Sequence, residues 1–218
     1  MRFDEVVTRR GSLARFGGLV VAAAGGTALA SDAADAGNRT IESGAVACVL
    51  TPELTEGPYY IAGEKLRRDI RDGHPGTLLT LHLSVLNAST CKPMNGAAVD
   101  IWHADAAGNY SGFGAGASSR TFMRGIQKTD ANGVATFTTV YPGWYQGRAV
   151  HIHVKVHAGG AVVHTGQLFF SDTLTDKVYT AAPYAQDSIF VNGGKTSVLE
   201  VAKRGSGYVG SIAMGVHA

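Results

Sequence analysis

Two histidines separated by one residue form the first candidate site for chemistry in this sequence. His151 and His153 belong to the run 150–157 (VHIHVKVH), in which apolar and polar side chains alternate. In a β-strand, residues two apart point to the same face, with backbones about 6.7 Å apart. Both imidazoles can therefore lean onto a single metal ion. Taken alone, the pattern fits a polar strand face with solvated histidines equally well.

Asp100 is a candidate third ligand. It alternates with the apolar residues Val99 and Ile101, which predicts a strand with the carboxylate on its polar face. Two histidines and one carboxylate are the ligand pattern of many Fe(II) enzymes. One hypothesis is therefore a copper or Fe(II) enzyme that uses His151 and His153.

Two tyrosines and an arginine accompany the histidine pair. Tyr145 ends the segment PGWY (142–145), and Arg148 stands between it and His151. Tyr110 lies in GNYSG (108–112), a loop directly after a predicted strand. Taken singly, each tyrosine could be a turn or edge aromatic, and the arginine could lie on the surface. Those separate readings do not explain why these residues occur together in this order.

Short strands separated by turns must position these side chains. Leucines at 79, 81 and 83 and Val85 alternate with polar residues, which predicts a half-buried strand. The sequence contains no βαβ pattern, so we expect an all-β protein, an antiparallel β-sandwich of prealbumin or immunoglobulin-like type. Residues 39–76 are expected to pack on it as irregular chain, with long loops around the active site. The other predicted strands are 97–103, 134–140, 149–157 and 161–170, with edge strands at 188–191 and 197–202.

Composition agrees with one turn-rich β domain. The 218 residues include 29 Gly and 6 Pro, with 8% aromatic, 17% charged and 45% hydrophobic residues. This balance excludes a disordered chain and disfavours a helical bundle. The net charge of +2 comes from residues 1–30, so the remainder is near neutral. Because no basic stripe is left, nucleic-acid binding is not expected.

The first 30 residues predict an export signal. Arg9 and Arg10 precede Ser12-Leu13 and a weakly hydrophobic, Gly- and Ala-rich run, 16–30. This arrangement resembles a twin-arginine signal, and an ordinary secretory leader is the alternative. Fifteen apolar residues are fewer than the roughly 20 that span a bilayer, so no membrane anchor is expected. We therefore expect a periplasmic or extracellular protein with a signal peptide at 1–30, a linker at 31–38 and a single domain at 39–218.

Several stretches, taken in order, carry a resemblance to a known family. The sequence resembles the intradiol ring-cleavage dioxygenases, non-haem iron(III) enzymes that open catechols between the two hydroxyl-bearing carbons. The pairing of PGxY with RxxHxH is its most specific part. The matching stretches are TPELTEGPYYI (51–61), GAAVDIWHADAAGNYSG (96–112), TDANGVATF (129–137), PGWYQGRAVHIH (142–153) and GQLFF (166–170).

The resemblance implies a ligand set and a reaction. Its Fe(III) ligands are Tyr110, Tyr145, His151 and His153. Phenolate oxygens are hard anionic donors, which suits Fe(III) better than Fe(II). The implied partners are a small aromatic diol and O2, and the product is a muconate-type diacid.

Other residues take supporting roles in this resemblance. Arg148 would stabilise negative charge that develops during the reaction, and Gln167 would support the site from a neighbouring strand. Gly57, Pro58 and Tyr59 match the loop that walls the substrate pocket. Trp102 and His103 are expected to be structural, and the remaining histidines match no motif.

A non-catalytic binding module is the main alternative. Prealbumin-like and carboxypeptidase-regulatory sandwiches share turn segments similar to TDANG (129–133) and PGxY (142–145), and a fold does not fix a function. Tyr110 and the HxH pair favour the enzyme, because a scaffold has no need of them. Cytoplasmic members of the family dimerise through a long helical N-terminal domain. We expect this protein to lack that domain, so the oligomeric state stays open.

Cys48 and Cys91 are the two cysteines of the chain, and we predict that they form a disulfide. The bridge would tie the irregular N-terminal segment to the sandwich and stabilise the fold by roughly 3 to 4 kcal/mol. Thiol titration of the denatured, non-reduced protein should detect no free thiol. Two reactive thiols would contradict the prediction.

Overall fold

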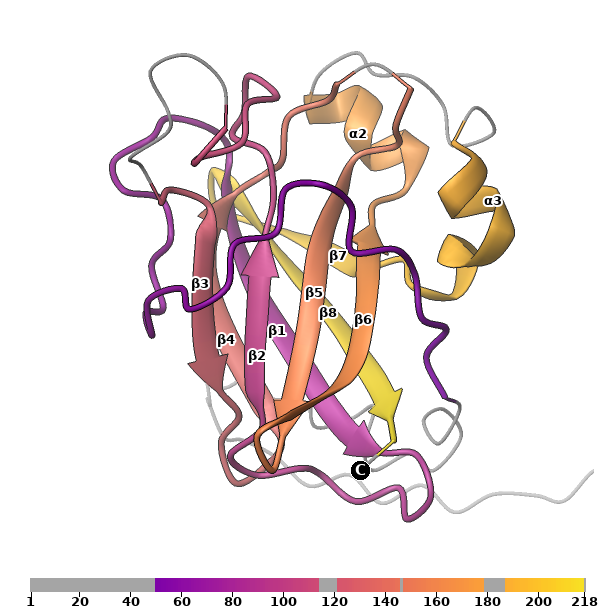
Figure 1. Cartoon of the computed structure of the whole chain (residues 1–218). Helices are drawn as coiled ribbons and strands as arrows, with labels where there is room; N and C mark the ends of the chain where they lie inside the picture. Colours follow the sequence, from indigo (N-terminus) through magenta and orange to yellow (C-terminus); the bar gives the residue numbers. More distant parts are fainter. Residues whose placement is uncertain (1–49, 114–120, 146, 179–186, 218) are drawn as a thin grey trace, which may run out of the picture. The chain divides into compact units, whose positions relative to one another are not determined.

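Most regular structure in the computed structural model is β-strand (Figure 1). It describes residues 50–113, 121–145, 147–178 and 187–217. The predicted signal peptide, the linker and Cys48 lie outside these ranges, so the disulfide stays a prediction. The elements are β1 (Leu78–Asn87), β2 (Ala98–Trp102), β3 (Arg124–Lys128), β4 (Val134–Val140), β5 (His151–Ala158), β6 (Ala161–Phe169), α2 (Asp172–Val178), α3 (Ser188–Gly193), η2 (Gly194–Thr196), β7 (Glu200–Arg204) and β8 (Gly207–Val216).

The strands form two four-stranded sheets, ordered β4-β1-β8-β7 and β3-β2-β5-β6. Neighbouring strands are antiparallel except β1 and β8, which run parallel with Leu79 opposite Tyr208. The prediction of antiparallel pairing was wrong for this pair. β8 pairs antiparallel with β7, and this arrangement leaves β8 parallel to β1. The alternation of polar and apolar residues predicts a strand, but it does not predict the direction of that strand relative to a distant partner.

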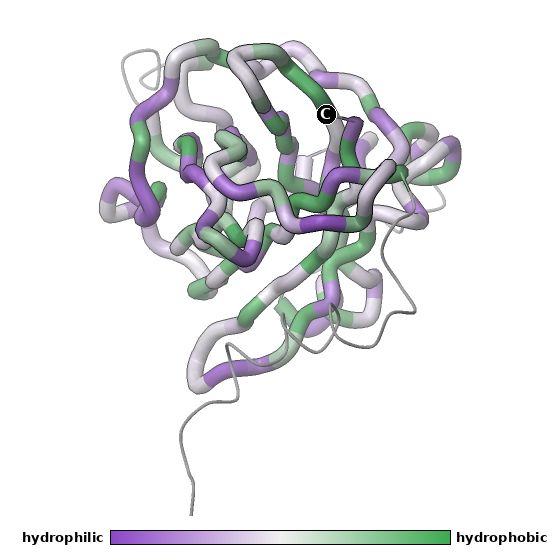
Figure 2. Tube along the Cα trace, turned by 90° about the horizontal axis from the view of Figure 1, so that it is seen from below, coloured by the Kyte–Doolittle hydropathy of each residue, from purple (hydrophilic) through white to green (hydrophobic). Residues whose placement is uncertain are grey.

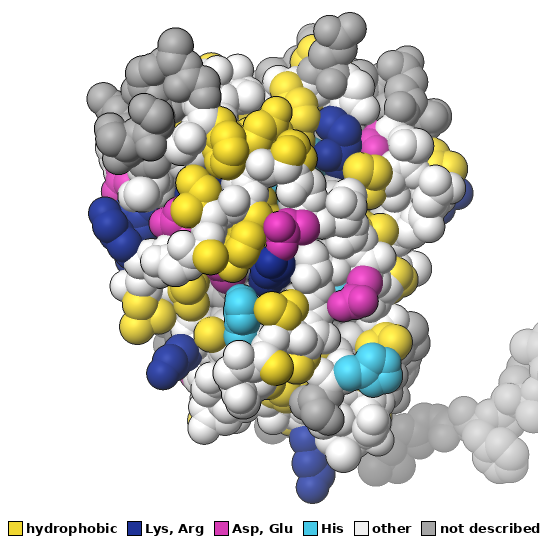
Figure 3. All heavy atoms as spheres, viewed as in Figure 1, with side chains coloured by type: hydrophobic (Ala, Val, Ile, Leu, Met, Phe, Trp, Pro, Cys, Tyr) yellow, Lys and Arg dark blue, Asp and Glu magenta, His cyan; other side chains and the backbone are white. Residues whose placement is uncertain are grey.

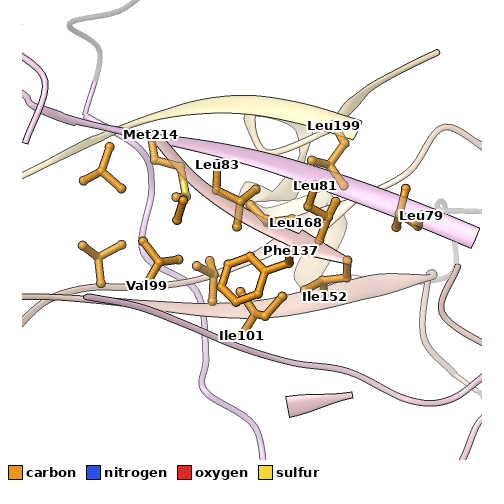
Figure 4. Packing of buried hydrophobic residues seen from close by; sticks show 14 of the residues in the cluster. Leu79, Leu81, Leu83, Val99, Ile101, Phe137, Ile152, Leu168, Leu199 and Met214 are labelled. Atoms are coloured by element: carbon orange, nitrogen blue, oxygen red, sulfur yellow. The ribbon is translucent and has the colours of Figure 1, made fainter. Parts of the chain in front are cut away.

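A hydrophobic core lies between the sheets (Figure 4). Seen from below in Figure 2, hydrophobic and hydrophilic residues follow one another closely along the chain. On β4, alternate positions are buried, so that strand turns one face to the core, whereas β5 is buried on both faces. On β1, the leucines at 79, 81 and 83 are 0% exposed, as their alternation predicts. The opposite sheet contributes Val99, Ile101, Ile152 and Leu168.

The prediction of a strand at 188–191 was wrong, because these residues begin helix α3. The Asp187 side chain accepts hydrogen bonds from the backbone N–H groups of Ile189 and Phe190, which caps the helix. A short apolar run does not by itself distinguish a strand from a buried helix. Within the described ranges, four elements had no predicted counterpart: β3, α2, η2 and β8.

An irregular segment, residues 50–70, crosses the outer face of the β3-β2-β5-β6 sheet, and we call it the covering segment (Figure 1). No helix or strand occurs in it, as predicted, apart from isolated bridges such as Leu66 with Ile126. Its Leu54 N–H donates to the Thr165 carbonyl on β6, and its Arg67 N–H donates to the Ile126 carbonyl on β3. The covering segment therefore buries the face of the sheet that carries the two histidines.

Candidate metal centre and active site

The two histidines stand at the start of β5 on the face under the covering segment. His151 is 2% exposed and His153 is 1% exposed, while Ile152 points into the core. The Nε2 atoms of the two imidazoles lie 3.1 Å apart. These side chains are therefore not solvated, which disfavours the interpretation of a polar strand face.

The two tyrosines reach the same point from separate loops. Tyr110 follows β2, and Tyr145 lies between β4 and β5. Their hydroxyl oxygens are 3.4 Å apart, and the Tyr145 oxygen is 3.0 Å from His151 Nε2. All four residues of the predicted ligand set thus converge.

Two glycines allow these loops to interlock. A Cβ on Gly143 would meet the Asp105 carbonyl oxygen at 2.4 Å, and one on Gly108 would meet the Trp144 carbonyl oxygen at 2.6 Å. The Gly143 N–H donates to the Asp105 carbonyl. Because only glycine permits so close a backbone approach, the loops that carry Tyr110 and Tyr145 are fixed against each other.

The four side chains fit one shared metal ion. Metal bonds of about 2.0 Å place neighbouring ligand atoms roughly 2.9 to 3.4 Å apart, and the separations here are 3.0 to 3.4 Å. His151 Nδ1 lies 2.7 Å from the Ala149 carbonyl oxygen, so Nδ1 carries the donated hydrogen. Its Nε2 therefore presents a lone pair toward the other ligands, the usual arrangement for a metal-binding histidine.

Burial controls the charge of these groups. It lowers the pKa of His151 to about 3 and that of His153 well below its ordinary value, with the charge of Arg148 acting in the same direction. Burial also raises the pKa of Tyr110 well above 10 and raises that of Tyr145. Both imidazoles are thus neutral donors, and a nearby cation would favour the phenolate form of the two tyrosines.

Arg148 lies against this centre. Its Nη1 is 3.3 Å from His151 Nε2 and 3.5 Å from the Tyr145 oxygen. Its Nη2 donates to the Gln167 side-chain oxygen, and Gln167 in turn donates to the Thr55 carbonyl. The predicted arginine and glutamine therefore form one connected group beside the four converging side chains.

The covering segment supplies the predicted pocket loop. Gly57 adopts a positive φ of 72°, and a Cβ there would lie 3.1 Å from His153 Cε1. The Tyr59 ring stacks on Tyr110 with centroids 4.3 Å apart, while Pro58 is exposed. Figure 3 shows this face, where hydrophobic side chains gather in the upper part. Gly57 and Tyr59 therefore contact the candidate ligands directly.

Trp102, which was expected to be structural, packs directly on one of the candidate ligands. It is the register neighbour of His153, and the two rings stack with centroids 5.0 Å apart and an interplanar angle of 7°. The sequence could have indicated this contact, because Trp102 lies on a predicted strand that can pair with the strand carrying the HxH pair. His103, by contrast, is fully buried and bonded to Thr139 and the Ala104 carbonyl, which is a structural role.

The alternative that Asp100 joins the histidines as a third ligand was wrong. Asp100 lies opposite Lys155, two residue pairs along the strands from Trp102 and His153. Among the described residues, no group of three or more His, Cys, Asp or Glu side chains could hold a metal. The side chains that do meet the histidine pair are the tyrosines, with the Tyr145 oxygen 3.0 Å from His151 Nε2.

Comparison with known proteins agrees with this geometry. Residues 55–201 match the sequence family described as Dioxygenase. A solved intradiol ring-cleavage dioxygenase from Tetranychus urticae is 34% identical, with a TM-score of 0.72 over 78% of this chain and 95% of that chain. The chain belongs to the intradiol ring-cleavage dioxygenase family.

Other intradiol dioxygenase relatives are bacterial. The dioxygenase domain of a carbohydrate-binding fusion protein from Streptomyces sp. SirexAA-E is 31% identical, with a TM-score of 0.61 over 78% of this chain and 99% of that domain. Catechol 1,2-dioxygenase 2 of Acinetobacter lwoffii is 34% identical over 136 residues, which are 50% of this chain and 47% of that protein. The match thus spans about half of that relative's length.

A buried carboxyl group beside the centre generates a pH prediction. Burial raises the pKa of Asp100 to about 7, helped by the charge of Glu64 and opposed by Tyr60, Lys155 and Arg124. Between about pH 4 and pH 7, the folded state then holds a proton that the unfolded state releases, so this group makes stability fall as pH rises.

Replacing Asp100 with Asn should therefore reduce the loss of stability that wild type shows between pH 5 and pH 8. Thermal unfolding across that range measures the difference. Asp176→Asn, which alters an exposed carboxylate on α2, is the matched control and should follow wild type. An Asp100→Asn variant with the wild-type pH dependence would contradict the assignment.

Proposed function

We propose that the chain is an exported non-haem Fe(III) dioxygenase that cleaves a catechol-type ring between its two hydroxyl-bearing carbons with O2, giving a muconate-type diacid. The observation that carries the proposal is the convergence of His151, His153, Tyr110 and Tyr145, with Arg148 beside them. Two neutral imidazoles and two phenolates offset much of a trivalent charge and favour Fe(III) over Fe(II). A binding module has no need of this buried arrangement.

Tyr110, Tyr145, His151 and His153 would hold Fe(III). The chemistry it would supply is withdrawal of electron density from the diol ring, which would activate that ring toward O2. The surrounding residues must position the substrate and handle its protons. Tyr59 and Gly57 cover the centre, and the Trp102 ring stacks on the face of the His153 ring. This enclosure limits water around the reacting atoms.

Tyr145 is suited to accept a proton from the substrate. Burial raises its pKa, so a Tyr145 phenolate would be a strong base toward a substrate hydroxyl proton. Arg148 stands 3.5 Å from that oxygen and supplies a fixed positive charge. The arginine can therefore stabilise negative charge that develops on the substrate during ring cleavage.

We infer a preference for catechols without a carboxylate group, because three arginines outside the centre are engaged with other protein groups. Arg67 is paired with Asp72 and Arg71 with Asp69. Arg124 donates to the carbonyl and hydroxyl of Ser111. A carboxylated substrate would need one of these arginines to leave its present partner.

Export is proposed from the leader alone. Arg9, Arg10 and the apolar run 16–30 lie outside the described residues, and their resemblance to a twin-arginine signal supports this part of the proposal. In the described part of the chain, every helix is too short or too polar to cross a bilayer.

Oxygen uptake by the iron-loaded protein tests the proposal, with catechol, hydroxyquinol, protocatechuate and chlorinated catechols as substrates. We expect one O2 consumed for each diol, both oxygen atoms in the diacid, and the lowest activity with the carboxylated protocatechuate. His151→Ala should lose iron and activity, because it removes a ligand. His82→Ala, which alters a histidine on the other sheet, is the control and should keep both. An iron-replete protein that consumes no O2 with any of these diols would overturn the proposal.

A further inference from the structure

Asp187 is a buried carboxylate that sequence reasoning missed and that lies directly behind the arginine of the site. It is 1% exposed and divides its two oxygens between two tasks. Oδ1 accepts from the N–H groups of Ile189 and Phe190 and so caps α3. Oδ2 accepts from Arg148 Nε at 3.1 Å and from the Ala149 N–H at 2.7 Å. Only the second oxygen faces the active site.

Two edges of the Arg148 guanidinium are hydrogen-bonded, and the third faces the candidate ligands. Its Nε donates to Asp187, its Nη2 donates to Gln167, and its Nη1 faces Tyr145 and His151. A planar guanidinium with two of its edges occupied cannot rotate freely, so the third edge keeps its direction. Asp187 therefore determines where the positive charge of Arg148 points.

The same carboxylate oxygen also acts on a ligand through the backbone. The Ala149 N–H donates to Asp187, and the carbonyl of Ala149 accepts from His151 Nδ1 at 2.7 Å. A hydrogen bond to the second nitrogen fixes the tautomer and the orientation of a ligand histidine. Asp187 thus braces the segment from which both Arg148 and His151 extend.

The charge of Asp187 suits this role. Burial alone would raise its pKa, but the hydrogen bond from Ala149 and the charge of Arg148 outweigh burial and hold that pKa below its ordinary value. The group therefore stays ionised at neutral pH, as an ion pair with Arg148 requires.

We propose that Asp187 is a positioning residue for ring cleavage, which aims the Arg148 guanidinium and steadies the His151 imidazole from the N-terminus of α3. This inference rests on the proposed function. The competing explanation is that Asp187 only caps the helix. The two explanations can be tested separately, because one carboxylate oxygen caps the helix and the other binds Arg148 and the Ala149 N–H.

Two substitutions separate them. Asp187→Ser keeps a hydroxyl that can cap α3, because serine is a favoured N-cap residue, but it supplies no second oxygen for Arg148 and Ala149. Asp187→Asn keeps the size of the side chain and removes its charge, which provides a second variant if the serine protein folds poorly. Asp176→Asn is the matched control, since it removes an exposed acid on α2.

A double-mutant cycle on iron-loaded protein measures the coupling. Arg148→Ala should retain iron and lower kcat on the order of a hundredfold. Asp187→Ser should lower kcat about tenfold with little change in KM, because its effect is on orientation. If Asp187 acts through Arg148, adding Asp187→Ser to Arg148→Ala should change kcat less than about twofold. A further tenfold loss in the double variant, or no loss in Asp187→Ser alone, would overturn the inference.

A readout independent of activity separates this inference from the proposed function. In 15N–1H spectra of the metal-free full chain, the Arg148 Nε–H should exchange slowly in wild type and in Asp176→Asn, and quickly in Asp187→Ser. Equal exchange in wild type and Asp187→Ser would overturn the inference even if the enzyme cleaves catechols. Slow exchange in wild type that Asp187→Ser abolishes would support the pairing even if no diol is turned over.

Discussion

Two phenol oxygens and two imidazole nitrogens meet at a buried point above one sheet. In the order Tyr110, Tyr145, His151 and His153, the successive atoms are 3.4, 3.0 and 3.1 Å apart. Burial keeps the imidazoles neutral and keeps the phenols protonated until a cation arrives. The fold therefore holds together four donor atoms whose types and spacing fit one metal ion. The neighbouring loops, the covering segment and Arg148 all contact this group.

Each part of the scaffold supplies one component of this geometry. The alternation of β5 places both histidines on one face, and Trp102 on the adjacent strand stacks on His153. Gly108 and Gly143 let the two tyrosine loops meet backbone to backbone. The covering segment then closes over the histidines and buries the centre. Rigidity therefore comes from close packing around the four side chains, which prepares them for the metal before it binds.

The sequence predicted what depends on local pattern. Strand periodicity located β1, β4 and β5, and the spacing of HxH predicted two imidazoles on one face. It did not predict the parallel pairing of β1 with β8, because a strand direction set by distant partners leaves no local trace. The apolar run at 188–191 was ambiguous until Asp187 was seen to cap it as a helix. Asp187 also lies 39 residues from Arg148, so their contact is a property of the fold alone.

The central claim is that Tyr110 and Tyr145 bind Fe(III) as phenolates together with His151 and His153. The visible absorption spectrum of the ferric protein tests it most directly. Charge transfer from phenolate to iron should colour the protein red, and Tyr110→Phe and Tyr145→Phe should each weaken or shift the band. Tyr208→Phe, on the opposite sheet, should leave it unchanged. A protein that binds one ferric ion and stays colourless, or a band that survives both active-site substitutions, would contradict the account.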